Sequence, residues 1–253
     1  MFLRTLGHGP PLVLIHGWAM HSGLFAPLLE HLAGDFSLHL ADLPGHGRSG
    51  SGTALAPDAI ATALLPRIPS GAIWLGWSMG GLVALQAAAR APAQVRALAV
   101  LASSPRFVAG NGWDLGASPQ VFAQFATGLA GNYAATIQRF LALEAVGAPL
   151  RAAQLRALEA RAFEHGPPSA AALEQGLALL QDADLRPAVA ALEVPSLWLA
   201  GRRDRMVPPA AMRWAADNAP GGRYLELDTG HMPFLTEPAR VAAAIREFAA
   251  GID

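Results

Sequence analysis

The sequence predicts an α/β protein: a mostly parallel sheet flanked by helices, with an inserted all-helical segment. Short apolar runs alternate with helical patterns over the first hundred residues, as in a parallel sheet covered on both faces. The alternation then stops, and residues 107–185 show helical patterns and no convincing strand. With 253 residues, 53% of them hydrophobic, the chain is long enough to bury a large core.

Composition excludes several kinds of chemistry. The formal net charge of −1 provides no overall field for binding nucleic acid or an anionic membrane. The absence of cysteine excludes disulfides, thiolate metal sites and cysteine nucleophiles, and all eighteen basic residues are arginine, which excludes a lysine Schiff base. No signal-peptide pattern and no apolar run of membrane-spanning length are found, so we expect a cytoplasmic protein.

The first half of the chain supplies most of the predicted sheet. Continuous apolar runs such as Leu12–Ile15 are typical of strands buried on both faces, and residues 2–5 are interpreted as a short edge strand. The strands expected here span residues 2–5, 12–15, 36–41, 73–77 and 95–102. The helices expected between them span residues 22–32, 57–65 and 79–90.

The strand that ends at Trp77 leads into a Gly-x-Ser-x-Gly motif around Ser78, and a helical pattern follows at once. A strand, a sharp turn and a helix in this order are typical of a nucleophile elbow, which exposes the serine hydroxyl above the sheet. Gly76 and Gly80 fit because a Cβ at either position would collide with a neighbouring element. The backbone amide of Met79 would then point to a developing oxyanion, beside the positive end of the helix.

A second candidate oxyanion donor follows the strand Leu12–Ile15. The chain continues as His16-Gly17-Trp18, and a strand that ends in His-Gly upstream of an elbow supplies a backbone donor in this kind of site. The donor would be the Trp18 amide, and the Trp18 ring would line the pocket. We interpret His16 as a residue that braces the loop through hydrogen bonds.

The helical insertion spans residues 107–185 and divides a core made of residues 1–106 and 186–253. Helical patterns cover residues 119–130, 132–146, 149–164 and 169–181, with glycines and prolines between them. Its position after the strand that follows the elbow favours a cap over the site, although a second packed helical layer would give the same pattern. Beyond it we expect strands at 196–200 and 223–227 and helices at 209–218 and 238–250.

Two loops of the second half provide the partners that a nucleophilic serine needs. Asp204 follows one strand and His231 follows the last, so the order Ser78, Asp204, His231 matches that of hydrolases built on this kind of sheet. His231 would be the general base, and Asp204 would hold its tautomer. Asp204 could instead cap a helix, and Asp228 is a rival acid placed too close in sequence to His231 to reach its Nδ1 well.

A metal site is the alternative use of the polar side chains in the loop after residue 41. His39, Asp42 and His46 are possible ligands, but their spacing matches no metal-binding motif. We therefore interpret this loop as structural and expect neither a metal nor a cofactor.

Several segments together resemble the pimeloyl-[acyl-carrier protein] methyl ester carboxylesterases of biotin synthesis, members of the α/β-hydrolase superfamily. The Trp-Ser pair inside the elbow and the Arg-Phe-Leu-Ala-Leu run of the insertion are the specific parts. The resembling segments are His16–Trp18, Asp42–Gly45, Trp74–Ala84, Ala102–Pro105 and Arg139–Leu143.

The resemblance implies hydrolysis of the methyl ester of a pimeloyl group on acyl carrier protein, with release of methanol. Ser78 would attack the carbonyl, and His231 would take its proton and later activate water. The substrate-binding residues that the resemblance implies are Trp18, Ser78, Met79, Phe140, Leu141, Ala142, Leu143, Glu144 and His231. Glu144 departs from the family, which more often has an uncharged amide at this position.

The implied partner is an acyl carrier protein met by a monomeric enzyme. Because carrier helices are acidic, we expect a basic patch on the cap, with Arg139, Arg151 and Arg156 as contacts and Arg161 available. The last three are five residues apart, a step of roughly 140° around a helix, so they form no single stripe.

Three functions stay open at the level of sequence. The first is the carrier-protein methyl esterase. The second is a general carboxylesterase or a C–C bond hydrolase with the same triad, which ester and dienone substrates would separate. The third is a non-catalytic binding protein, which would require a broken triad, and all three positions are filled.

Overall fold

The computed structural model describes residues 1–144 and 152–252, and a seven-stranded sheet runs through this part of the chain. The spatial order is β1-β3-β2-β4-β5-β6-β7, and neighbouring strands are parallel except β1 and β3. The strands are β1 Leu3–Leu6, β2 Pro11–Ile15, β3 Ser37–Ala41, β4 Ala72–Trp77, β5 Val95–Leu101, β6 Ser196–Gly201 and β7 Gly222–Leu227. The mostly parallel sheet predicted from the alternation is confirmed.

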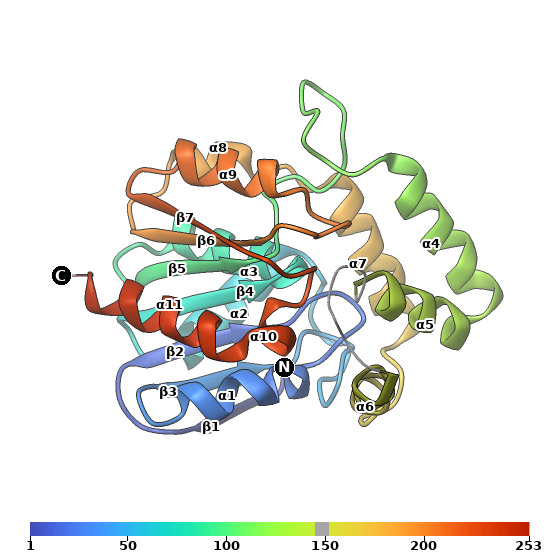
Figure 1. Ribbon diagram of the computed structural model, residues 1–253, viewed down its shortest axis with the longest axis horizontal. Helices are drawn as coiled ribbons and strands as arrows, with labels where there is room; N and C mark the ends of the chain where they lie inside the picture. The colour runs from blue at the N-terminus through green and yellow to red at the C-terminus, as the bar shows by residue number, and fades with distance from the viewer. Residues whose placement is uncertain (145–151, 253) are drawn as a thin grey trace.

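Helices cover both faces of this sheet (Figure 1). On one face α1 packs against α11, and on the other α2, α3, α8 and α9 pack in succession. The helices around the sheet are α1 Ala26–Leu32, α2 Pro57–Leu64, α3 Met79–Arg90, α8 Arg186–Ala190, α9 Pro209–Asn218, α10 Pro233–Thr236 and α11 Pro238–Ala250. The carboxyl ends of the parallel strands are left for the loops that carry the candidate site.

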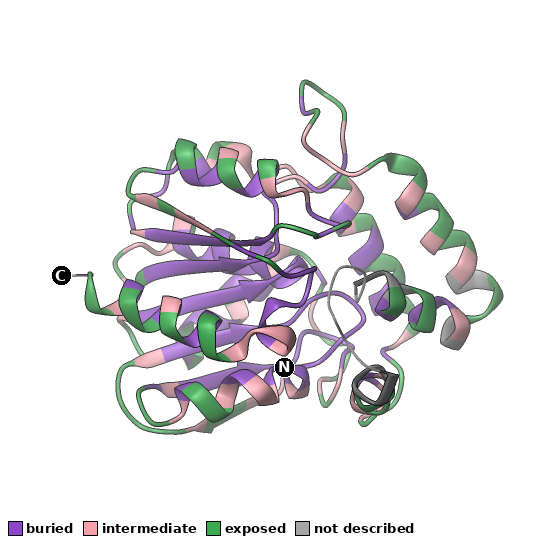
Figure 2. Cartoon of the chain, viewed as in Figure 1, coloured by how far each residue is buried: buried purple, intermediate pink, exposed green. Residues whose placement is uncertain are grey.

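The inner strands are almost entirely buried, whereas the edge strands β1 and β7 are mostly exposed or half-buried. Every residue of β4 is buried, but β1 exposes Arg4 and Thr5. The difference follows from position, because a central strand is covered on both faces and along both edges. Figure 2 shows the buried residues concentrated in the sheet and the exposed ones on the outer surfaces of the helices. Among the described residues, no helix is both long and apolar enough to cross a bilayer.

A group of four helices lies between β5 and β6 in sequence and forms a lobe beside the sheet (Figure 1). Ser118 and Ser169 cap the first and last of them by accepting a hydrogen bond from a first-turn amide. These helices, called the cap below, are α4 Pro119–Gly131, α5 Tyr133–Glu144, α6 Ala152–Ala162 and α7 Ala170–Asp182. The inserted helical segment is therefore present, and its predicted limits at 107 and 185 stay a prediction.

One local prediction needs correction, and the structure adds elements that were not predicted. The single helix predicted over residues 22–32 is a 3-10 turn, Ser22–Phe25, followed by α1, because the His21 ring accepts a hydrogen bond from the Gly23 amide at the start of the turn. Helices α8 and α10 were not predicted, since five and four residues are too few to show a helical period. Residues 107–118, for which no helix was predicted, form a loop with a bridge between Val108 and Ala117.

Candidate active site

The turn between β4 and α3 holds Ser78 in a conformation that side chains rarely adopt. Its backbone lies at φ 54° and ψ −125°, and it is one of few non-glycine residues with positive φ in the described chain. The turn is closed by a 2.8 Å hydrogen bond from the Gly81 amide to the Ser78 carbonyl. A Cβ on Gly76 would overlap the backbone of Gly80, and one on Gly80 would lie 2.6 Å from the His16 carbonyl oxygen. The elbow geometry and its need for glycine therefore match the sequence motif.

The loops after β6 and β7 bring Asp204 and His231 together. Nδ1 of His231 lies 2.7 Å from Oδ2 of Asp204, and the two side chains are only 2% and 1% exposed. The amides of Met206 and Val207 donate to the other carboxylate oxygen of Asp204, at 2.8 and 2.9 Å. Because a carboxylate can only accept, His231 carries its proton on Nδ1, and Nε2 is the basic nitrogen.

Trp77 connects the histidine loop to the elbow. Its indole N–H donates a 2.9 Å hydrogen bond to the carbonyl oxygen of His231, and the centroids of the two rings are 5.8 Å apart. Phe234 packs edge-on against the same indole. Because Trp77 directly precedes Ser78, the histidine loop is tied to the residue beside the candidate nucleophile. The sequence pattern contains this tryptophan but gave no sign of the tie.

The rival carboxylate, Asp228, is used elsewhere. It pairs with Arg202 at 2.6 Å and with Arg203 at 3.2 Å, and its side chain is 54% exposed. The hydrogen bond from Arg202 lowers the pKa of Asp228 below its usual value. Asp228 therefore binds the two arginines at the surface, while Asp204 contacts the imidazole.

The loop after β2 passes close to Ser78. A Cβ on Gly17 would lie 3.1 Å from the Ser78 Cβ and 3.3 Å from the Trp77 ring, so glycine permits the approach. Trp18 follows and is 2% exposed. Its indole N–H donates a 3.0 Å hydrogen bond to the Leu173 carbonyl of α7, so its ring joins this loop to the cap.

Two buried histidines hold the same loop. His16 accepts from the Leu43 amide at 2.8 Å and donates to the Gly17 carbonyl at 2.7 Å, so the bracing predicted for it is observed. His46 accepts from the Ala19 amide at 3.2 Å and donates to the Pro44 carbonyl at 2.9 Å. Both rings are fully bonded in the neutral form. Burial lowers the pKa of His16 to about 3 and that of His46 to about 4.

The remaining polar side chains of the loop after β3 bind protein groups. Asp42 accepts hydrogen bonds from Ser22 and from the backbone and guanidinium of Arg48. Burial opposes its ionisation, but these donors outweigh burial, and the pKa of Asp42 falls well below its usual range. His39 contacts the Thr5 and Ser37 hydroxyls instead. Within the described part of the chain, no three His, Asp or Glu side chains are grouped to hold a metal ion.

The structure locates some of the predicted cap contacts. Leu141 is buried and Ala142 is exposed on α5, and Arg139 and Arg156 are exposed. The side chains of Phe140, Leu143 and Glu144, and all of Arg151, lie outside the described residues.

Sequence reasoning missed His21, which donates from Nε2 to the Arg161 carbonyl at 2.8 Å and so joins the end of α6 to the core.

These features define a class of protein. The family described as "alpha/beta hydrolase fold" matches residues 10–238, and the chain belongs to this family. Over the whole of both chains it is 49% identical to the pimeloyl-[acyl-carrier protein] methyl ester esterase of Xanthomonas campestris pv. campestris. It is 48% identical to the protein of that name from Stenotrophomonas maltophilia, over 100% of this chain and 97% of that one. The resemblance inferred from the motifs is thereby confirmed.

Solved structures of low identity share the fold. The esterase EaEST from Exiguobacterium antarcticum superposes with a TM-score of 0.90 at 19% identity, over 99% of this chain and 95% of that one. The enol-lactonase from Burkholderia xenovorans superposes with a TM-score of 0.83 at 21% identity, over 98% and 96%. At such identities the likeness shows the architecture alone.

Proposed function

We propose that this protein is a serine carboxylesterase that hydrolyses the methyl ester of a pimeloyl group carried on acyl carrier protein, in biotin synthesis. The observation that carries the proposal is the 46–49% identity, over the full chain, to proteins with that name. The buried Asp204–His231 pair beside the elbow supplies the chemistry that such an activity requires. The products are methanol and the free acid on the carrier.

In the proposed mechanism Ser78 attacks the ester carbonyl while Nε2 of His231 accepts the hydroxyl proton. Asp204 holds the imidazole through Nδ1 and stabilises its positive charge. The backbone amides of Trp18 and Met79 receive the oxyanion of the tetrahedral intermediate. When the intermediate collapses, the imidazolium gives its proton to the departing methoxide. Water, deprotonated by His231, then attacks the acyl-enzyme, and the proton returns to Ser78 as the acid leaves.

The chemistry requires a neutral His231 at the start of each cycle. The 2.7 Å contact with Asp204 fixes the ring through Nδ1, and the two amide donors keep the Asp204 carboxylate in place. The fixed ring needs no reorientation when the proton is transferred, which is the benefit of a preorganised site. This arrangement supports the roles proposed for Asp204 and His231.

Under this proposal the cap binds the rest of the substrate. The segment from Phe140 to Glu144 contacts the acyl chain, with Trp18 on the opposite wall. Arg139, Arg151 and Arg156 contact acidic residues of the carrier. The exposure of Arg139 and Arg156 supports the carrier contact, because an arginine must reach solvent to meet a partner.

The experiment that tests the function is genetic complementation. The gene should restore growth without biotin in a bacterial host that lacks its own pimeloyl-carrier methyl esterase, and the Ser78→Ala variant should not. Thermal unfolding of purified Ser78→Ala at the wild-type temperature would show that the fold is kept. Failure of the wild-type gene, together with high activity on short p-nitrophenyl esters, would instead indicate a general carboxylesterase. Turnover of dienone ring-fission products would indicate a C–C bond hydrolase.

Labelling gives an independent test of the nucleophile. A fluorophosphonate probe should modify Ser78 in the wild-type protein and leave Ser78→Ala unmodified, as seen by mass spectrometry of the peptides. An unlabelled wild-type protein would favour the non-catalytic binding protein.

We further propose that the enzyme acts as a monomer in the cytoplasm, where it meets its carrier partner. Light scattering after size exclusion should give the mass of one chain, 26.3 kDa.

A further inference from the structure

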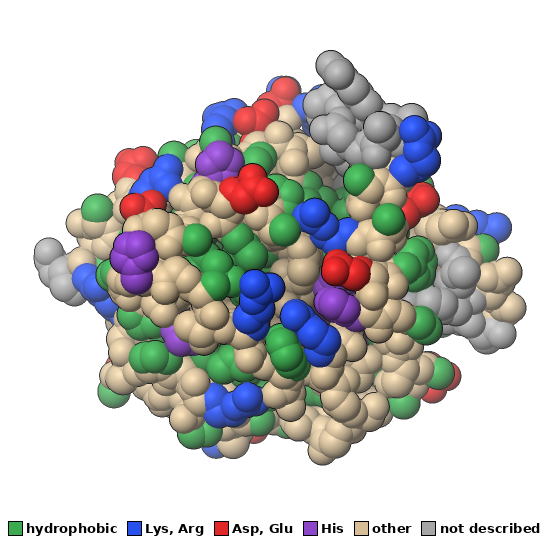
Figure 3. Space-filling view, turned by 90° about the horizontal axis from the view of Figure 1, so that it is seen from below, with side chains coloured by type: hydrophobic (Ala, Val, Ile, Leu, Met, Phe, Trp, Pro, Cys, Tyr) green, Lys and Arg blue, Asp and Glu red, His purple; other side chains and the backbone are tan. Residues whose placement is uncertain are grey.

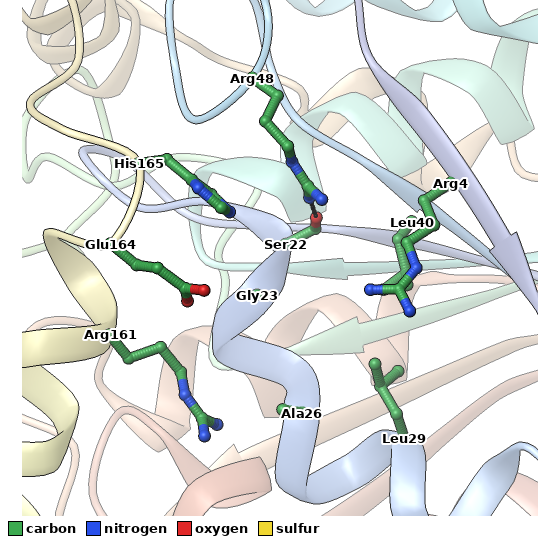
Figure 4. A pocket seen from close by; sticks show the side chains of 10 residues that line it. All are labelled: Arg4, Ser22, Gly23, Ala26, Leu29, Leu40, Arg48, Arg161, Glu164 and His165. Carbon is green, nitrogen blue, oxygen red and sulfur yellow. Dashed lines mark hydrogen bonds between the residues drawn. The ribbon is translucent and has the colours of Figure 1, made fainter.

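A cavity lies where the first strands of the sheet meet the end of α6, and no residue of the elbow lines it. Its volume is about 300 Å³. It is open to solvent on the face seen in Figure 3, where arginine side chains gather near the middle. The polar residues that line it are Arg4, Ser22, Arg48, Arg161, Glu164 and His165. Figure 4 shows that they come from both the core and the cap.

The charged groups of this cavity are mostly cationic. Three arginines line it against one carboxylate, Glu164. Within residues 1–144 and 152–252, neither Arg4 nor Arg161 has a carboxylate within ion-pair distance. Two guanidinium groups that line one cavity and are not neutralised by an ion pair provide a site for an anion.

Arg48 is held in place before any ligand binds. Its Nε donates to Asp42 at 2.8 Å and one terminal nitrogen donates to Ser22 at 2.9 Å, while its guanidinium stacks on the Phe2 ring at 3.9 Å. The other terminal nitrogen has no hydrogen-bond acceptor in the described residues. A fixed guanidinium loses little side-chain entropy on binding, which favours recognition of an oxyanion.

The cap side of the cavity is fixed through His21. Its ring donates to the Arg161 carbonyl at 2.8 Å and lies 4.6 Å from the ring of His165. The last turn of α6 and the loop after it are thus held against the core by one buried side chain. A ligand in this cavity would therefore contact the core through Arg4 and Arg48 and the cap through Arg161 and His165.

We propose that this cavity is a binding site for a phosphate group, and that the bound group joins the cap to the core. Phosphate oxygens accept hydrogen bonds from several guanidinium groups at once, and the volume is sufficient for a phosphate with a short substituent. Glu164 also lines the cavity and would weaken the site by repulsion. The proposal uses no residue of the elbow and does not depend on the esterase function.

Calorimetric titration with inorganic phosphate tests the proposal. We expect saturable binding by the full-length protein in a phosphate-free buffer. Arg4→Ala should raise the dissociation constant for phosphate about tenfold, because a charge-assisted contact is lost. Glu164→Gln should lower this constant about threefold, because one negative charge is removed from the cavity. Arg4 is exposed and makes no ion pair in the described chain, so its removal should leave the unfolding temperature unchanged.

The matched control is Arg213→Ala, which removes the same charge at the opposite edge of the sheet. Arg213 lies on α9 and stacks on Tyr224 of β7, whereas Arg4 lies on β1. Phosphate affinity should be unchanged in this variant. The proposal is wrong if phosphate does not bind saturably, or if Arg4→Ala and Arg213→Ala bind it equally well.

Two sources of the phosphate are separated by a second ligand. The second ligand is 4′-phosphopantetheine, the arm on which carrier proteins hold their acyl groups. If the natural ligand is free phosphate, inorganic phosphate should bind as tightly as 4′-phosphopantetheine. Tighter binding of 4′-phosphopantetheine, lost together with phosphate binding in Arg4→Ala, would assign the site to that arm. Slower hydrogen exchange of residues 152–162 on addition of either ligand would show that the bound group joins cap and core. Unchanged exchange at saturation would remove that second part of the proposal.

Discussion

The loops at the strand ends of the core and the helices of the cap are held in different ways. In the core, Asp204 and the two histidines behind the Gly17 loop have their polar atoms bonded to protein groups, and all are buried. Among the described residues, the hydrogen bonds between cap and core include those that join Trp18 to Leu173 and His21 to Arg161, and much of the cap surface is exposed (Figure 2). A site fixed in the core beside an exposed cap separates chemistry, which needs fixed geometry, from substrate binding, which the cap can vary.

The largest effect is expected from a substitution that changes one atom of the Asp204 side chain in the core. Asp204→Asn keeps the shape of the side chain but places an amide against Nδ1 of His231, which favours the wrong tautomer. We expect kcat on a p-nitrophenyl ester to fall by about 10³- to 10⁴-fold, with KM little changed. Asp228→Asn is the matched control, because it removes a carboxylate that pairs only with surface arginines. Equal loss in both variants would show that the acid was misassigned.

A second test examines the core through the pH dependence of its stability. In the folded state the pKa of His16 is about 3 and that of His46 about 4, against 6.5 when unfolded. Between pH 6.5 and about 4 the unfolded chain therefore binds more protons, so stability falls as the pH falls through this window. Each histidine contributes a slope of about 1.4 kcal/mol per pH unit.

Urea unfolding at several pH values measures this slope. His46→Asn should lower the free energy of unfolding at pH 7. It should also reduce the slope of that free energy against pH by about 1.4 kcal/mol per pH unit, the contribution of one buried histidine. A slope identical to that of the wild-type protein would show that His46 does not titrate as its surroundings imply.

The contact between Trp18 and α7 can be disturbed by a larger side chain at Gly176. A Cβ on Gly176 would overlap the Trp18 indole, so Gly176→Ala should push α7 away from the loop after β2. We expect a loss of about 1–3 kcal/mol in the free energy of unfolding, measured in urea. Gly131→Ala is the control, because its Cβ would meet nothing within 4 Å, and it should be neutral or slightly stabilising. An unchanged free energy of unfolding in Gly176→Ala would mean that α7 can shift away from Trp18 without loss of stability.

The smallest expected effect lies on the outer surface of the cap. Arg139→Ala and Arg156→Ala should each raise KM for a carrier-borne ester about threefold and leave hydrolysis of a free methyl ester unchanged. The reason is that rim charges act mainly on association with the partner. Kinetics on both substrates, at low and at physiological salt, check this. An equal change on both substrates would place these residues in the pocket instead.

Local pattern was enough to predict the sheet, the elbow and the pairing of Asp204 with His231. Buried parallel strands are continuous apolar runs, and a Gly-x-Ser-x-Gly turn between a strand and a helix is typical of an elbow, so few residues carry the signal. The choice of Asp204 over Asp228 followed from a distance argument, and the ion pairs of Asp228 agree with it. The helical character of the cap was also predicted, because its four helices are long enough to show a period.

Only the tertiary structure revealed what joins elements distant in sequence. The hydrogen bond from Trp77 to His231, the tie from His21 to Arg161 and the cavity around Arg4 all bring together residues from separate elements. No local periodicity encodes such contacts, since they depend on how the strand order places the loops in space. A sequence motif can therefore name the candidate reacting groups of this protein. The partners that orient those groups, and the cavity beside the cap, are decided by packing over the whole chain.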